Sequence, residues 1–215
     1  MFLRVWADQI CCLWANEDTN AEIKQTLDTG NIDILGMTWY FNETNPLSGF
    51  TEWIDYALQN NPNIKIFVSI PPIDFPADWQ QAAEDSGYNN IRDLYEDVVS
   101  DLTHKATIDQ LRELYPSTEV FTLPTGWATF DLVDQHENNL LLDDISLFGS
   151  YDDSIFRDTK GHQGKIVINT GALIWLNGLY GVNLRTNDSD TGFNTDLHTI
   201  AENIMDLHDT NYKQQ

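Results

Sequence analysis

Apolar positions along the chain fall into two patterns, short continuous runs and longer stretches with helical spacing. The short runs are rich in β-branched and aromatic residues and predict buried parallel strands over residues 32–39, 64–70 and 119–123. The longer stretches predict helices over 20–27, 51–59, 90–114 and 126–133, with Asn20 and Ser48 as the expected N-caps of the first two. Strands and helices therefore alternate, which favours an α/β fold with a parallel sheet.

The last third of the chain predicts a nearly fully buried helix over 166–180 that ends at Gly181. His162 lies on the loop or first turn that leads into this helix. An acidic turn and a final helix follow over about 185–213. Because the sequence has no repeat, no low-complexity stretch and no convincing linker, we expect residues 1–215 to form one domain.

Ligands of open parallel sheets bind at the carboxyl ends of the strands. This rule directs attention to residues 38–42, 71–75 and 124–127, which follow the three predicted strands. Thr38 and Asn42 offer polar groups there. Trp39 and Trp127 offer aromatic faces that could stack on a sugar ring or an acyl group, with ordinary core packing as the alternative.

Asp158 and His162 form the strongest chemical feature of the sequence. A carboxylate beside an imidazole fixes the tautomer of the ring and stabilises its protonated form, as a general base for a hydroxyl nucleophile requires. A surface helix cap is the alternative interpretation of the same spacing. Nothing in the pattern requires a cofactor or a metal ion.

Charge excludes several classes of partner. The 215 residues include 34 Asp and Glu but 11 Lys and Arg, a formal net charge of −23, which repels phosphate backbones and anionic membranes. No apolar run approaches the roughly 20 residues of a membrane helix. The only cysteines, Cys11 and Cys12, are adjacent and offer neither a disulfide framework nor a four-ligand zinc site. The N-terminus lacks the pattern of a secretory signal, and the localisation stays open.

The block from 156 to 181, with its Asp158, Gly161, His162 and apolar helix, resembles the last block of the SGNH (GDSL-type) hydrolases, in which the final helix follows an Asp-x-x-His motif. The segments GNIDILGMTWY and WIDYALQNNPNIKIFVSIPP are similar to those of many bacterial members, and the resemblance covers most of 20–184. It implies a flavodoxin-like three-layer α/β/α fold and hydrolysis of carboxylic esters, including carbohydrate esters. It also implies that His162 is the base and Asp158 its partner.

The chain departs from the family pattern in three ways. Asp158 lies four residues before His162 rather than three, so Asp153 is an alternative partner. The family's Gly-x-Asn-Asp block has only a loose counterpart in Gly36 and Thr38, with Asn42 beyond. No serine precedes Ser48 where the family has its nucleophile, and the first strand is at most a stub over 2–6.

The missing serine leaves several interpretations open. Cys11 or Cys12 could replace it as the nucleophile. Otherwise the chain is an inactive member or a non-catalytic protein that binds a carbohydrate or another small ligand. A phosphate-handling flavodoxin-like domain is disfavoured, because no Gly-rich loop follows a strand. A reduced first strand would leave a sheet edge open, which favours a homodimer.

Overall fold

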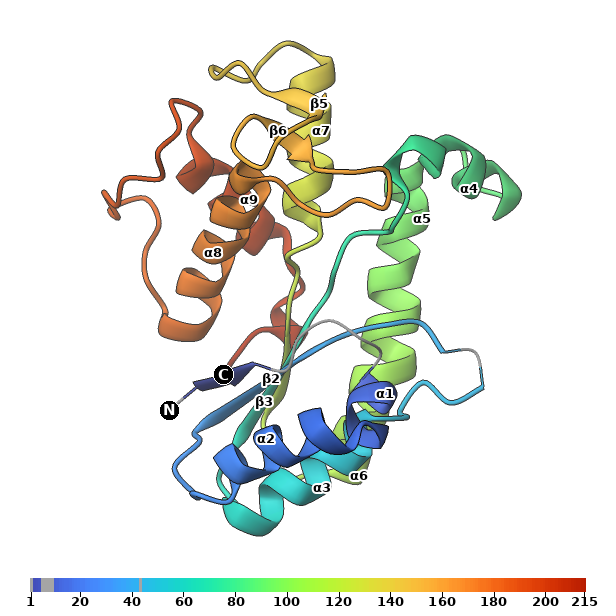
Figure 1. Ribbon diagram of the computed structural model, residues 1–215, viewed down its shortest axis with the longest axis vertical. Coiled ribbons are helices and arrows are strands. Elements are labelled where there is room, and N and C mark those ends of the chain that lie inside the picture. Colours follow the sequence, from blue (N-terminus) through green and yellow to red (C-terminus); the bar gives the residue numbers. More distant parts are fainter. Residues whose placement is uncertain (1, 5–9, 43) are drawn as a thin grey trace. The chain divides into compact units, whose positions relative to one another are not determined.

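The computed structural model describes residues 2–4, 10–42 and 44–215, and the chain forms two compact units (Figure 1). Unit 1 contains Met1–Pro71, Val98–Leu123 and Asn211–Gln215, and unit 2 contains Pro72–Asp97 and Pro124–Thr210. The single domain expected over 1–215 stays a prediction.

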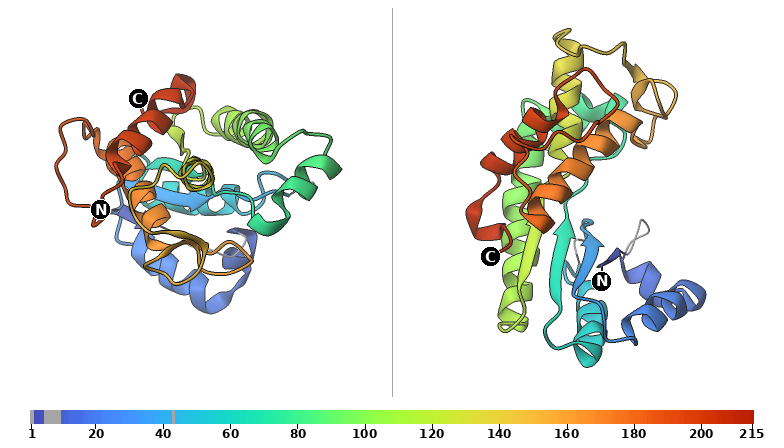
Figure 2. Two further views of the ribbon diagram at one scale, coloured as in Figure 1. Left: turned by 90° about the horizontal axis from the view of Figure 1, so that it is seen from above. Right: turned by 90° about the vertical axis from the view of Figure 1, so that its left-hand side faces the viewer.

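Unit 1 contains a parallel four-stranded sheet (Figure 2), which confirms the predicted α/β class. Its strands follow one another in chain order: β1 (Phe2–Arg4), β2 (Ile34–Thr38), β3 (Lys65–Ser69) and β4 (Val120–Leu123). The three predicted strands are therefore confirmed within one or two residues at each end. The fourth, β1, covers part of the expected stub, while the stub's Trp6 lies outside the described residues.

Helices α1 (Ile10–Ala15) and α2 (Glu17–Leu27) connect β1 to β2, and α3 (Phe50–Asn60) connects β2 to β3. Right-handed connections that step in one direction along a parallel sheet place their helices on the same face. The core agrees, because one face of β2, β3 and β4 packs against α2, α3 and the helical segment before β4. Its largest fully buried members include Trp53, Phe50, Leu27, Leu35 and Met37.

The strand order bears on the expected flavodoxin-like fold. Flavodoxin-like sheets have the order 2-1-3-4-5, in which strands 1, 3, 4 and 5 also step in one direction. The order found here matches that run of four. A flavodoxin-like sheet would have one more strand beside β1, at that edge of the sheet. No such strand is among the described strands of this sheet. The α/β class is thus established, and the finer assignment stays a proposal.

Both predicted N-caps are wrong. Asn20 lies inside α2, which begins at Glu17 with two acidic residues in its first turn, where negative charge favours a helix N-terminus. The Asn20 amide instead donates to the Trp14 carbonyl at 2.6 Å. Helix α3 instead has Gly49 at its N-cap, and the Gly49 N–H donates to Glu52 Oε2 at 2.8 Å, the half of a capping box that the N3 side chain provides.

The helix predicted over 90–114 is confirmed, with an unexpected π-helical middle. It consists of α5 (Ile91–Asp97), the 12-residue π-helix η2 (Val98–Asp109) and α6 (Gln110–Leu114). The hydroxyls of Thr103 and Thr107 donate to carbonyls five residues earlier, at 2.9 and 3.0 Å. A π-helix of this length is rare, and such segments often lie at functional sites.

Unit 2 contains the remaining elements. They are η1 (Pro76–Asp78), α4 (Trp79–Asp85), α5, α7 (Trp127–Glu137), a two-stranded parallel sheet of β5 (Ser146–Phe148) and β6 (Ser154–Phe156), α8 (Lys165–Tyr180) and α9 (Leu197–Leu207). A last turn, η3 (Thr210–Tyr212), leads back into unit 1. Helices α7, α8 and α9 pack against one another. Helix α8 ends at Gly181 with φ 63°, as predicted, but the expectation of a nearly fully buried helix is wrong, because Ile168 and Tyr180 are exposed.

None of the helices formed by the described residues is long and apolar enough to cross a membrane.

Candidate functional site

Asp158 and His162 meet in a tight turn of unit 2, just before α8. Asp158 Oδ2 lies 2.5 Å from His162 Nδ1. The carboxylate therefore occupies one ring nitrogen and leaves Nε2 on the opposite side of the ring. Both side chains are about half exposed, 45% for Asp158 and 53% for His162, so water reaches them. Asp153, the alternative partner, instead accepts a hydrogen bond from the Ser150 hydroxyl at 2.9 Å.

The second oxygen of Asp158 fixes the turn. Asp158 Oδ1 accepts hydrogen bonds from the backbone N–H groups of Lys160, Gly161 and His162 at 3.1, 3.1 and 3.2 Å. The hydrogen bond with the His162 ring is the main cause that lowers the pKa of Asp158, with smaller contributions from the His162 and Gly161 N–H groups. Asp158 is thus an anchored carboxylate that stays ionised at neutral pH.

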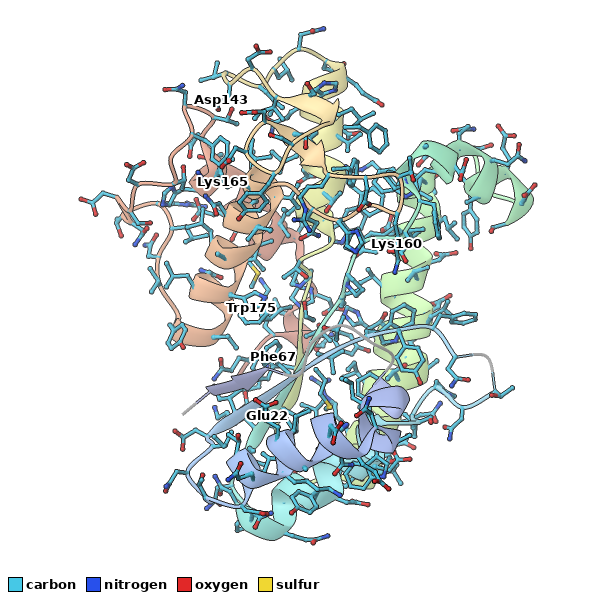
Figure 3. All side chains as sticks on the ribbon, in the orientation of Figure 1. Glu22, Phe67, Asp143, Lys160, Lys165 and Trp175 are labelled. Atoms are coloured by element: carbon cyan, nitrogen blue, oxygen red, sulfur yellow. The ribbon has the colours of Figure 1, made fainter. Side chains whose placement is uncertain are left out.

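A neighbouring loop holds the turn from its other side. The Phe75 N–H donates to the Lys160 carbonyl at 2.9 Å, and Lys160 is labelled in Figure 3. Gly161 has φ 101°, and a Cβ there would lie 3.0 Å from Pro76 Cδ. Only glycine suits both the backbone conformation and the close approach of Pro76. The Asp158–His162 pair is therefore exposed but held in place.

The strand ends predicted to carry the site are aligned in unit 1. Thr38, Ser69 and Leu123 are register partners and the last residues of β2, β3 and β4. Beyond them, the chain stays in unit 1 after Thr38 but passes into unit 2 at Pro72 and again at Pro124. The predicted site residues Thr38, Trp39 and Asn42 thus belong to unit 1, and the Asp158–His162 pair and Trp127 belong to unit 2.

A hollow of about 280 Å³ lies where the chain leaves β2, between residues 39–42 with Pro46 and one face of η2. We call it the strand-end hollow. Trp39, Phe41 and Leu102 give it apolar walls, and Asn42 and Thr107 add polar groups. Trp39 is buried, and its Nε1 donates to Thr107 Oγ1 at 3.2 Å, while Phe41 is 52% exposed. The two ring centres lie 6.4 Å apart, and of the two side chains it is Phe41 that is exposed to solvent.

Asn42 organises the loop that borders this hollow. Its Oδ1 accepts from the N–H groups of Thr44 and Asn45, both at 3.1 Å, and from the Thr44 hydroxyl at 2.9 Å. Its amide donates to the Tyr40 hydroxyl at 3.4 Å. These bonds form an Asx turn, so Asn42 shapes the hollow as well as lining it.

Trp127 lies in a different aromatic cluster, at the start of α7 in unit 2. Its ring meets Tyr95 edge-on at 4.8 Å, and the Arg92 guanidinium lies 5.0 Å from the ring centre. Arg92 in turn binds Asp131, whose pKa is raised mainly because burial disfavours the charged carboxylate, although the guanidinium opposes this. Trp127 thus joins helices α5 and α7 by packing.

The structure brings some predicted residues together and not others. Asp158 meets His162, and Trp39 and Asn42 line one hollow with Thr38 at its strand end. Trp127 belongs to neither group. Thr107, which fixes the Trp39 ring, was missed, because a contact between residues 68 positions apart has no local signal.

Cys11 and Cys12 lie in α1, but their side chains are outside the described residues, so the cysteine nucleophile stays a prediction. Within the described ranges, no group of three or more His, Cys, Asp and Glu side chains could hold a metal ion.

Comparison of the chain with protein-family profiles, with curated proteins and with solved structures found no match. Support for the candidate site therefore comes from the geometry of its own residues.

Proposed function

We propose that the chain is a carboxylic ester hydrolase of the SGNH type, on a flavodoxin-like fold, with Asp158 and His162 as its general-base pair. One observation carries the proposal. The carboxylate of Asp158 contacts Nδ1 of His162 and is itself held by three backbone N–H groups. This is the arrangement in which a carboxylate orients an imidazole and stabilises the imidazolium that forms during proton transfer.

In the proposed reaction, Nε2 of His162 removes a proton from the attacking group as that group adds to the ester carbonyl. The imidazolium then returns the proton to the departing alcohol oxygen, and an acid and an alcohol result. Such positioned proton transfer contributes roughly 10²–10⁴ in rate.

The attacking group we propose is water, because the His162 ring is exposed. Within unit 2 as described, the hydrogen bonds of the His162 side chain go to Asp158 alone, so Nε2 is left to accept the proton of that water. Alkylation of the cysteines with iodoacetamide should therefore leave the turnover unchanged, and a loss of turnover would contradict water as the attacking group.

The test is hydrolysis of p-nitrophenyl acetate by the wild type and by His162→Gln and Asp158→Asn. We expect His162→Gln to lower kcat/KM about 100-fold, because the proton acceptor is removed. Asp158→Asn should lower it less, since the imidazole remains but is poorly oriented.

Exposed histidines react weakly with this ester, so a second histidine serves as the control. His198 is half-buried, and its Nε2 contacts Asn187 Oδ1 at 3.0 Å. His198→Gln should keep the wild-type rate. Equal rates for His162→Gln and His198→Gln, with both variants folded by circular dichroism, would contradict the proposal.

Non-catalytic binding of a carbohydrate or another small ligand is the second candidate. The strand-end hollow favours it, because apolar walls with a few polar groups are typical of small-molecule sites. The same assay separates the candidates, since a binding protein gives no turnover that depends on His162.

A further inference from the structure

Unit 2 contains a second hollow, of about 340 Å³, bordered by α4, α5, α7 and the end of β6. We call it the α7 hollow. One face of α7 lines it through residues three or four positions apart: Phe130, Val133, Asp134 and Glu137. Its size lies at the lower end of the range for small-molecule sites. It contains none of the residues proposed above for catalysis.

Three buried aromatic rings form the apolar part of the α7 hollow. Trp79 stacks on Phe130 with ring centres 4.6 Å apart and meets Phe156 edge-on at 5.7 Å. The Trp79 Nε1 donates to the Ile73 carbonyl at 3.0 Å, which satisfies its polar atom. The rings are thus fixed by one another, and because each is almost fully buried, a ligand would meet only the small part of them that is exposed.

Among the charged groups around these rings, the carboxylate of Glu137 is the one without a cationic partner among the described residues. Arg92 binds Asp134 through one nitrogen and Asp131 through another, both at 2.7 Å, so the charge of Asp134 is already shared with a guanidinium. Glu137, one turn further along α7, has no hydrogen bond or ion pair among the described residues. It lines the hollow with an exposed side chain.

We propose that the α7 hollow binds a small organic cation, an ammonium group attached to an apolar body. The body would contact the aromatic surface, and the charge would lie near Glu137. The chain's net charge of −23 adds a field that favours cations and repels anions. This inference is independent of the proposed hydrolysis.

Binding of three probes with one shared ring tests the charge preference. The probes are benzyltrimethylammonium, neutral benzyl alcohol and anionic benzoate, titrated by calorimetry or by ligand-observed NMR at low salt. We expect the cation to bind about fivefold more tightly than the alcohol, the size of effect typical of an exposed ion pair. Benzoate should show no binding.

Variants locate the site. Glu137→Gln should remove the preference for the cation over the alcohol, whereas Ala77→Phe, at the rim of the hollow, should weaken both probes by filling space. Glu96→Gln is the matched control, because Glu96 is an exposed carboxylate on α5 outside the lining, and the substitution changes the net charge equally.

Three results would overturn the proposal. The first is absence of binding by the cation. The second is equal affinity for cation and alcohol, which would indicate a purely apolar site. The third is the same loss in Glu137→Gln and Glu96→Gln, which would assign the effect to overall charge. Because none of these measurements involves turnover, their failure is distinguishable from failure of the proposed hydrolysis.

Discussion

Asp143, labelled in Figure 3, illustrates how one side chain ties together distant parts of unit 2. Its Oδ1 accepts from the N–H and the amide of Asn194 at 2.9 and 3.0 Å. Its Oδ2 accepts from the N–H and the hydroxyl of Thr195 at 2.9 and 2.7 Å. Burial alone would raise the pKa of Asp143, but these hydrogen bonds together outweigh it and lower the pKa.

Asp143→Asn should therefore lower the free energy of unfolding at pH 7 by about 1 kcal/mol, since hydrogen bonds to a charged acceptor are lost. A lowered folded-state pKa gives stability that is fully present above the ordinary pKa of Asp, about 3.9, and disappears as the pH falls through the folded-state value. The difference between variant and wild type should thus shrink in acid.

Urea unfolding at pH 7 and pH 3.5 measures this. Asp144→Asn is the control, because that neighbouring exposed carboxylate has no hydrogen bond among the described residues. A variant effect of equal size at both pH values would contradict the explanation.

At the scale of single residues, the sequence predicts contacts between positions close in the chain and misses contacts between distant positions. Asp158 and His162 are four positions apart, and a single turn suffices to bring them together. Asp143 lies 52 positions from Thr195, and Trp39 lies 68 from Thr107. Neither contact leaves a local pattern, because both depend on how the chain returns through space.

Secondary-structure elements follow the apolar pattern closely where burial is one-sided or complete. Phe50, Trp53, Ile54 and Ala57 recur at helical spacing and are the buried residues of α3. The pattern fails at helix ends, where the N-cap of α3 is Gly49 rather than Ser48. It also fails in η2, because a π-helix changes backbone bonding without an evident change in apolar spacing.

The start of α8 gives a prediction at this scale. A Cβ on Gly164 would lie 1.8 Å from the Ser154 carbonyl oxygen, whereas a Cβ on Gly171, in the middle of the same helix, meets nothing within 4 Å. Gly164→Ala should cost about 3 kcal/mol through forced backbone displacement. Gly171→Ala should stabilise by about 0.5–1 kcal/mol, because glycine is a poor helix former.

Thermal unfolding of the two variants, followed by circular dichroism, compares one substitution at two sites of one helix. Equal shifts of Tm, or a lower Tm for Gly171→Ala than for Gly164→Ala, would show that the approach of Ser154 does not govern this position.

In the whole molecule, 34 acidic residues outnumber 11 basic ones, and this imbalance sets how the thermal stability responds to salt. Like charges repel across the folded surface, and 0.1 M salt largely screens the repulsion between exposed charges more than about 10 Å apart. We expect Tm to rise between 0.05 and 1 M NaCl. The double variant Glu96→Lys and Asp144→Lys, with two fewer acidic residues and two more basic ones, should show a smaller rise.

Differential scanning calorimetry at a series of NaCl concentrations gives the result, with sucrose of matched osmolality as the control for general solute exclusion. If Tm is constant or falls with NaCl, charge repulsion is not what limits the stability of this chain.

The two units were not predicted, because the apolar pattern shows no linker between them. The reason is that neither unit is continuous in sequence. Unit 1 alone draws on three separate stretches, and the chain passes between units at four points. Composition and periodicity are local quantities, so they do not detect units whose segments alternate along the chain.

Unit 1 includes the last five residues of the sequence. Tyr212 is buried against it, stacked on His104 with ring centres 3.7 Å apart and with its hydroxyl donating to Asp109. A ribosome makes the chain from the N-terminus, so β1 to β4 leave it long before Tyr212 does. This part of the core therefore stays unfilled until every residue of unit 2 has been synthesised.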